Sequence, residues 1–138
     1  MSKNINPNPQ EIRFAALAVD AVCFRVMDGR MEVLLGKVGS GNNIYNGKWA
    51  HIGGLIRATE TAEQAVDRLL ADKAGVKNVY KEQLYTFSAI DRDPRGRVVS
   101  VAYIVLINGA NTEDFTRPQI ETVWQSVSKL PKLAYDHN

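Results

Sequence analysis

Runs of apolar and β-branched residues, separated by turn residues, occupy most of the chain, and apolar residues take helical spacing in one segment. Asp28-Gly29 stands between two such runs and indicates a tight hairpin, because both turn residues must accept positive φ. A second turn is expected at Asn46-Gly47. The segments that we interpret as strands are 13–27, 31–35, 48–52, 82–90, 98–106 and 121–127.

The helical segment begins at Thr61 and ends at Gly75. Thr61 and Gln64 have the spacing of a capping box, in which each side chain accepts from the other's backbone N–H. Gly75 suits the left-handed residue that ends many helices. The apolar positions between them are Ala62, Ala65, Val66, Leu69 and Leu70. One helix among about six strands favours the α+β class, a mixed sheet with the helix packed on one face.

The composition is that of an ordinary globular domain of 138 residues. A net charge of +2 is too small to indicate binding to nucleic acid or a membrane. Cys23, the single cysteine, lies in an apolar run, so we expect a buried thiol. Without a disulfide, a signal peptide or a long apolar span, a reducing cytoplasm is the expected location. We expect residues 1–11 to be a flexible lead-in and 12–128 to form one domain.

The segment from Gly54 to Val76 reads GLIRATETAEQAVDRLLADKAGV and resembles the Nudix box, G-x5-E-x7-R-E-U-x-E-E-x-G-U. The positions that match its spacing are Gly54, Glu60, Arg68, Leu70, Gly75 and Val76. The resemblance implies an α/β/α sandwich with a mixed sheet, and a Glu60–Arg68 ion pair that braces the loop on the helix. It also implies a second helix, for which 112–120 is the available candidate.

The metal positions of the resemblance do not match. The three carboxylates that hold the divalent metal in the family would fall at Leu69, Asp72 and Lys73, whose charges cancel. Magnesium requires hard oxygen ligands, so we expect no magnesium, no metal site, no catalytic residue and no cofactor. Simpler roles remain open for these side chains: Leu69 in the core, and Lys73 complementing the helix dipole. A displaced metal is the alternative, although Glu63 and Asp67 face another flank and Glu113 and Glu121 cannot be placed.

Ligand-binding residues are expected on both sides of the box. Gly53 and Gly54 permit close approach to a diphosphate, whereas His51 before them is interpreted as a hydrogen-bonded strand residue rather than a catalytic base. The loop 91–97, DRDPRGR, offers arginine forks for phosphates and carboxylates for hydroxyls; a solvated hairpin with paired charges is the alternative. This loop resembles that of ADP-ribose pyrophosphatases and of the related Nudix transcriptional regulators of NAD metabolism. The resemblance implies these further ligand residues: Lys37, Arg57, Asp93, Arg95, Arg97, and Phe87 or Tyr85 stacked on adenine.

The tail LPKLAYDHN, 130–138, resembles the junction that precedes a winged helix-turn-helix in those regulators. Residues 129–138 would then be a linker stub toward an absent DNA-binding domain; a frayed terminus is the alternative. The expected function is a catalytically inactive ADP-ribose sensor of a homodimeric repressor, which binds DNA only through the absent domain and binds no membrane. The alternatives are an active ADP-ribose pyrophosphatase that yields AMP and ribose 5-phosphate, and a ligand-free interaction scaffold.

Overall fold

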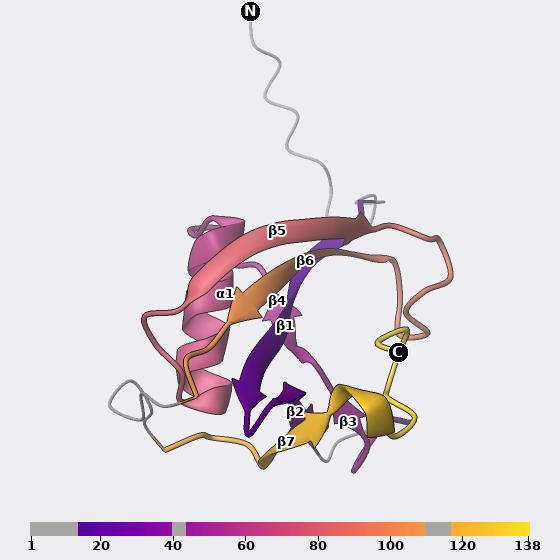
Figure 1. The fold of residues 1–138 in the computed structure, drawn as a ribbon. Coiled ribbons are helices and arrows are strands. Elements are labelled where there is room, and N and C mark those ends of the chain that lie inside the picture. The colour runs from indigo at the N-terminus through magenta and orange to yellow at the C-terminus, as the bar shows by residue number, and fades with distance from the viewer. Residues whose placement is uncertain (1–13, 40–43, 110–116) are drawn as a thin grey trace, which may run out of the picture.

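A mixed seven-stranded β-sheet forms the centre of the computed structural model, which describes residues 14–39, 44–109 and 117–138 (Figure 1). Strands and helices of the described part follow one another as β1 (Ala16–Met27), β2 (Arg30–Lys37), β3 (Trp49–Ala50), β4 (Ile52–Leu55), α1 (Ala62–Leu69), the π-helical turn η2 (Leu70–Ala74), β5 (Tyr80–Phe87), β6 (Val98–Leu106), β7 (Thr122–Ser126) and the 3₁₀ turn η3 (Val127–Lys129). The α+β class with a mixed sheet is therefore confirmed.

Strand β1 organises the sheet. It pairs in parallel with β6 along one edge, whereas its other edge pairs with β4 at 18–21 and with β2 at 24–27, both antiparallel. The order is β3-β2-β1-β6-β5, with β7 beside β2. Strands β4 and β2 pair with different parts of the same edge of β1, and β3 pairs with the end of β2. The ends of β2, β3 and β4 therefore lie close together.

The turn and the strand boundaries follow the sequence with small shifts. Asp28 and Gly29 have φ of 50° and 72°, so the predicted hairpin turn is present. The strand expected at 48–52 is interrupted at His51 and belongs to two strands, β3 and β4. Strand β5 begins two residues earlier than predicted and ends at Phe87, before the loop.

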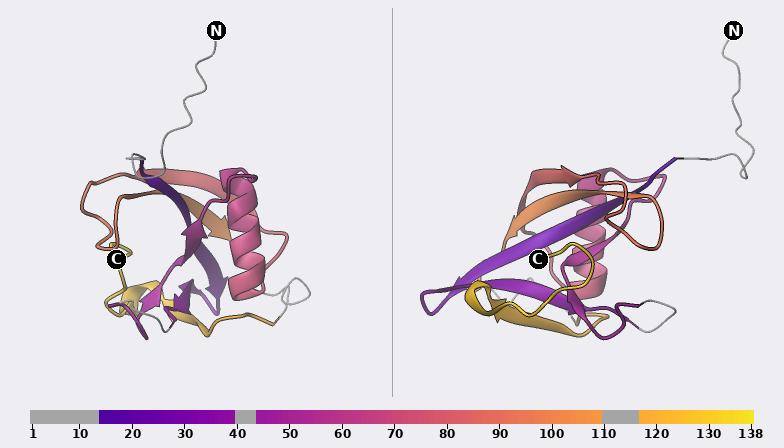
Figure 2. Two further views of the ribbon diagram at one scale, coloured as in Figure 1. Left: turned by 180° about the vertical axis from the view of Figure 1, so that it is seen from behind. Right: turned by 90° about the vertical axis from the view of Figure 1, so that its right-hand side faces the viewer.

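Helix α1 lies across one face of the sheet (Figure 2). Its capping box is confirmed: Gln64 N donates to Thr61 Oγ1 at 3.2 Å, and Thr61 N donates to Gln64 Oε1 at 2.9 Å. The helix continues through η2 to Gly75, whose φ of 68° ends it as predicted. Cys23 is fully buried beneath it, and burial raises the pKa of its thiol.

Two predictions fall wholly or largely outside the described residues. The lead-in 1–11 is one. The second helix at 112–120 is the other; the part of it that is described, 117–120, forms a bend and no helix. Among the described residues there is also no helix that is long and apolar enough to cross a membrane.

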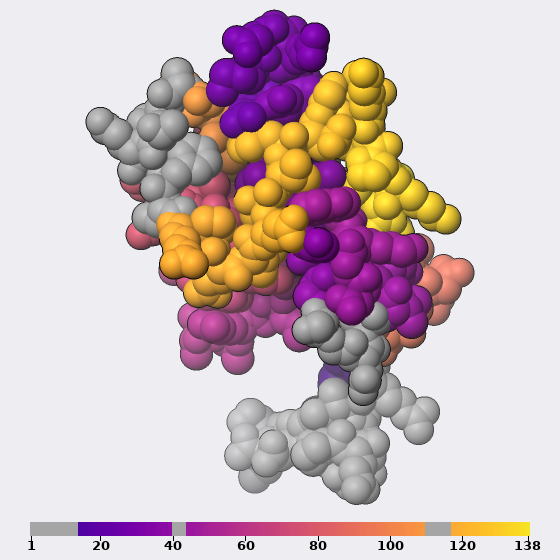
Figure 3. Space-filling model, turned by 90° about the horizontal axis from the view of Figure 1, so that it is seen from below, coloured from indigo at the N-terminus to yellow at the C-terminus, as the bar shows by residue number. Residues whose placement is uncertain are grey.

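The C-terminal tail, residues 130–138, packs on the domain, so the alternative of a frayed terminus is wrong; that 129–138 link to a further domain stays a prediction. Leu133 and Ala134 are buried, and Ala134 N donates to Trp49 O at 2.8 Å. Figure 3 shows the yellow tail lying against the purple segment that contains β3. The folded unit therefore extends beyond 128 to the last described residues, because Leu133 completes a small apolar cluster with Val33 and Leu35.

Candidate functional site

A cavity of about 380 Å³ lies between the end of β2, strand β4, the loop that follows β5, and the C-terminal tail. Its walls carry both apolar and charged side chains. The residues that line it are Ala18, Asp20, Gly36, Lys37, Val38, Gly39, Ala50, His51, Ile52, Gly53, Gly54, Leu55, Lys73, Arg92, Asp93, Arg95, Val98, Ile120, Tyr135 and His137. A space of this size with several convergent polar groups is typical of a small-molecule site.

Gly53 and Gly54 form the floor of the cavity, as the sequence predicts. A Cβ at Gly53 would clash with Asp20 Oδ1 and lie 2.7 Å from Val19 O, and a Cβ at Gly54 would lie 2.8 Å from Leu69 Cδ2. At Gly53 the backbone leaves no room for a side chain, and at Gly54 the buried Leu69 side chain would have to shift. The paired glycines therefore bring the backbone of β4 against both Asp20 and the helix.

Asp20, on β1, is the carboxylate of the floor. It accepts a hydrogen bond from the Ser100 hydroxyl, and its Oδ1 lies 3.5 Å from His137 Nε2. Asp20 is not predicted as a site residue from the sequence, since a single acidic residue in an apolar strand carries no motif. Its place between two apolar residues of a core strand is the signal that could have indicated it, because a buried carboxylate needs partners.

Lys73 enters the cavity from the helix side. Its Nζ donates to the backbone carbonyl of Gly53 at 2.5 Å. Burial lowers the pKa of the ammonium; nearby Asp20 opposes that shift, whereas Arg68 and Arg95 add to it. The side chain is therefore not only a complement to the helix dipole.

The three residues at the metal positions do not converge. Leu69 is buried in the core beneath Gly54, Asp72 is exposed and does not line the cavity, and only Lys73 enters it. Within the described ranges, no group of three His, Cys, Asp or Glu residues could hold a metal ion. Magnesium prefers several oxygen ligands, so these residues do not fit a divalent cation.

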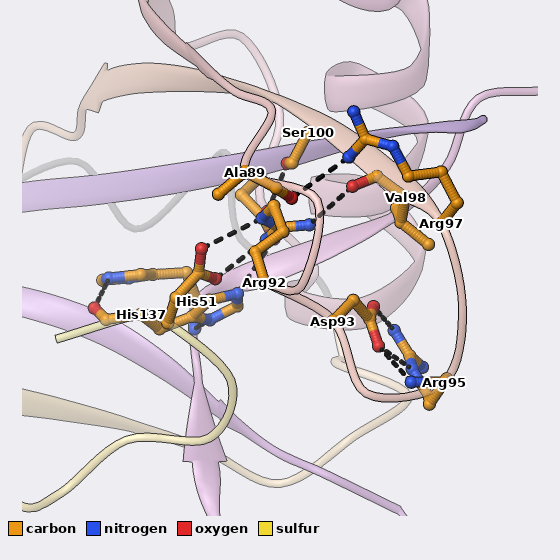
Figure 4. Close-up of polar contacts among 11 residues, drawn as sticks. His51, Ala89, Arg92, Asp93, Arg95, Arg97, Val98, Ser100 and His137 are labelled. Carbon is orange, nitrogen blue, oxygen red and sulfur yellow. Dashed lines mark hydrogen bonds and ion pairs between the residues drawn. The ribbon is translucent and has the colours of Figure 1, made fainter.

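The loop between β5 and β6 lies over the cavity and is held by its own charges (Figure 4). Arg95 donates to Asp93 through Nε at 3.0 Å and Nη2 at 2.8 Å, and its guanidinium lies 4.7 Å from the ring centre of Tyr135. The hydrogen bonds from Arg95 lower the pKa of the buried Asp93 carboxyl. The charges of this loop are therefore paired with each other, and the loop also lines the cavity, so features of both interpretations of residues 91–97 are present.

Arg92 joins the loop to the tail. It makes a bidentate ion pair with Asp136, with Nε–Oδ2 at 2.9 Å and Nη2–Oδ1 at 2.8 Å, and the side chain is only 6% exposed. Arg92, Tyr135 and His137 all line the cavity and were not predicted as site residues. The sequence of the tail resembles a linker, and a linker predicts no side chains in a binding site.

His51 and His137 bind each other through backbone and ring. His51 N donates to His137 Nδ1 at 3.0 Å, and His51 Nε2 lies 3.0 Å from His137 O. Burial, followed by repulsion from His137, lowers the pKa of His51 to about 4. His51 is thus hydrogen-bonded through Nε2, as the structural interpretation expects, whereas its buried Nδ1 has no hydrogen-bond partner among the described residues.

Three side chains expected at the ligand lie outside the cavity. Arg57 is exposed on the loop of the box, and Phe87 packs edge-on against Tyr85 on the exposed surface of β5. Arg97 donates to the carbonyls of Ser88 and Ala89 and so fastens the loop. Lys37, in contrast, lines the cavity, where it forms an ion pair of 3.1 Å with Glu121.

The Glu60–Arg68 ion pair is present and braces the loop before α1. Arg68 Nη2 lies 2.6 Å from Glu60 Oε1 and donates to Leu55 O at 2.9 Å. The Arg68 side chain, followed by the backbone N–H of Arg57, lowers the pKa of Glu60 to about 2. This brace fixes the end of β4 against the helix, and with it the glycine floor.

Comparisons with known proteins agree with this geometry. A family model of the NUDIX domain matches residues 16–138. The NUDIX domain of Shewanella oneidensis NrtR, crystallised with ADP ribose, superposes with a TM-score of 0.77 at 33% identity, covering 96% of this chain and 87% of that one.

Two curated proteins are also similar. The ADP-ribose pyrophosphatase of Methanocaldococcus jannaschii is 33% identical over 122 residues, which are 88% of this chain and 68% of that protein. The ADPR responsive transcriptional repressor NtrR of Acinetobacter baylyi is 29% identical over 126 residues, so this chain spans only 50% of its length. The chain belongs to the Nudix family, and its sequence and structure are closely similar to the Nudix domain of NrtR.

Proposed function

We propose that this chain is the effector-binding domain of a transcription regulator, and that it binds ADP-ribose or a related nucleotide diphosphate without hydrolysing it. The observation that carries the proposal is that the three residues at the metal positions cannot hold a metal together. Leu69 is buried in the core, Asp72 is exposed to solvent, and Lys73 brings an ammonium group into the cavity. The similarity to a NrtR domain crystallised with ADP ribose supports the choice of ligand.

The regulator role rests on the similarity to the Acinetobacter repressor, of which half lies outside the match. In this proposal the intact protein is a homodimer that contacts DNA through a separate domain. The ligand would release DNA by favouring one arrangement of the dimer, which requires different affinities for the two arrangements. The domain alone should then bind DNA weakly or not at all.

Two measurements on the wild-type chain test the proposal. Calorimetric titration with ADP-ribose should show saturable binding, which EDTA leaves unchanged. Incubation with ADP-ribose and Mg²⁺ or Mn²⁺ should yield no AMP above a protein-free blank. Absence of any binding heat would favour the scaffold alternative and contradict the proposal.

The second candidate is an active ADP-ribose pyrophosphatase, favoured by the 33% identity to the Methanocaldococcus enzyme. It predicts metal-dependent release of AMP and ribose 5-phosphate, abolished by EDTA. Metal-dependent release of AMP would mean that carboxylates outside the three altered metal positions assemble a metal site. It would contradict the proposal of an inactive sensor.

A further inference from the structure

The positively charged side chains of the cavity differ in what they bind. Four cationic side chains and two anionic ones line it. Three of the cations are held by a carboxylate: Lys37 by Glu121, Arg92 by Asp136, and Arg95 by Asp93. The fourth, Lys73, donates to the neutral carbonyl of Gly53, and no carboxylate of the described residues lies within ion-pair distance of it.

Lys73 is also placed for a ligand at the glycine floor. It comes from η2, which the backbone ties to the segment just before β7, since Ile120 N donates to Lys73 O at 3.3 Å. An ammonium has three N–H donors, and the contact with Gly53 uses one of them. Lys73 thus places a fixed positive charge beside Gly53 and Gly54, where the absence of a side chain lets a ligand approach the backbone.

Asp20 is the group that could neutralise Lys73. Its charge favours the protonated form of Lys73, but its carboxylate is engaged by the Ser100 hydroxyl and lies beside the His137 ring. The contact with Lys73 also covers the Gly53 carbonyl, whose oxygen would otherwise repel a phosphate. The Asp20 carboxylate keeps its negative charge at the floor, so Lys73 is the group there that attracts an anion.

We infer that the Lys73 ammonium binds the diphosphate of the ligand and supplies the positive charge for which a divalent cation would otherwise be needed. This inference rests on the proposed function, because it presupposes that a nucleotide diphosphate occupies the cavity. It adds that a residue of the altered box itself is the principal diphosphate contact, which explains why binding would not need magnesium. A partly buried ammonium binds an anion more strongly than an exposed one, since less solvent screens the pair.

The test is calorimetric titration of ADP-ribose into wild type, Lys73→Met and Lys77→Met. Lys77 is the matched control, since it is exposed, four residues further on and outside the cavity. Lys73→Met should weaken ADP-ribose binding about 10- to 100-fold, the effect expected for a hydrogen bond to a charged group. Lys77→Met should bind as wild type does, and Lys73→Arg should recover part of the loss.

Adenosine, which has no diphosphate, separates this contact from a general change in the cavity. Its binding should be the same in wild type and Lys73→Met, if both unfold at the same urea concentration. Equal ADP-ribose affinity of wild type and Lys73→Met would overturn the inference and leave the proposed function intact. No binding of ADP-ribose to wild type would instead refute the proposed function.

A measurement on the unmodified chain keeps the inference testable even if Lys73→Met does not fold. Mg²⁺ should change the affinity of wild type for ADP-ribose by less than about twofold, because no further cation is required. A rise of tenfold or more on adding Mg²⁺, reversed by EDTA, would overturn it.

Discussion

The two walls of the cavity are built in different ways. The helix-side wall consists of the glycine floor (Gly53 and Gly54) together with Lys73. It comes from neighbouring elements of one sequence segment and is braced by Glu60 and Arg68. The tail-side wall joins the loop 91–97 to residues 135–137, far along the chain, through the Arg92–Asp136 ion pair. The first wall rests on the large apolar core, whereas the second depends on long-range polar contacts and a small apolar cluster.

This difference has a consequence for function. A wall that is part of the core stays in place, whereas a wall that ends in the C-terminal tail can change position at lower cost. The tail-side wall is therefore the part of the cavity that we expect to respond more readily when a ligand binds. The following predictions test whether the walls differ in this way.

The largest effect is expected for Leu69→Ala on the helix side. Leu69 is 5% exposed and contacts Gly54, so its truncation leaves a cavity under the floor. The free energy of unfolding in urea should fall by about 3–5 kcal/mol. Leu55→Ala is the control: Leu55 is 59% exposed, and its loss should cost less than about 1 kcal/mol. Equal effects of the two variants would contradict a core role for Leu69.

Leu133→Ala should cost less, about 2–3 kcal/mol, because its cluster is smaller. The tail offers its own control in Leu130, which is 38% exposed, compared with 2% for Leu133. Urea unfolding gives the stability, and amide hydrogen exchange should show faster exchange at Ala134 in Leu133→Ala than in Leu130→Ala. Unchanged protection at Ala134 would mean that Leu133 does not hold the tail.

The tail-side wall should weaken first in mild acid. The pKa of His51 is about 4 in the folded protein and 6.5 in the reference state. The unfolded chain therefore binds the proton more readily, and the stability present above pH 6.5 should decline by roughly 1–3 kcal/mol as the pH falls toward 4. Urea unfolding of wild type and His51→Gln between pH 7 and 4 checks this. A decline of the same size in His51→Gln would assign it to other groups.

The smallest effect is expected from the helix-side brace, at lower pH. The ion pair with Arg68 holds the pKa of Glu60 at about 2, below its usual 4.5, so its contribution is present above 4.5 and is lost as the pH falls toward 2. The stability difference between wild type and Glu60→Gln should narrow over that range, modestly because solvent screens the pair. A difference that persists at pH 2 would show that the charge of Glu60 is not the cause.

Local sequence determined much of this protein. The Asp-Gly turn, the capping box, the Gly75 stop and the Glu60–Arg68 brace all involve residues within a few positions or one helix of each other, so their geometry follows from backbone preferences and spacing. For the same reason the box, its glycine floor and the loss of its carboxylates were recognisable from the residues alone.

Only the tertiary structure decided the rest of the cavity. It placed Asp20 beside the glycine floor, brought Tyr135 and His137 into the wall, and left Arg57, Phe87 and Arg97 outside. The pairing of β1 with β4 and the packing of Leu133 on β2 join segments that are distant in sequence. No local pattern encodes such contacts, because they depend on which apolar faces the whole chain buries together.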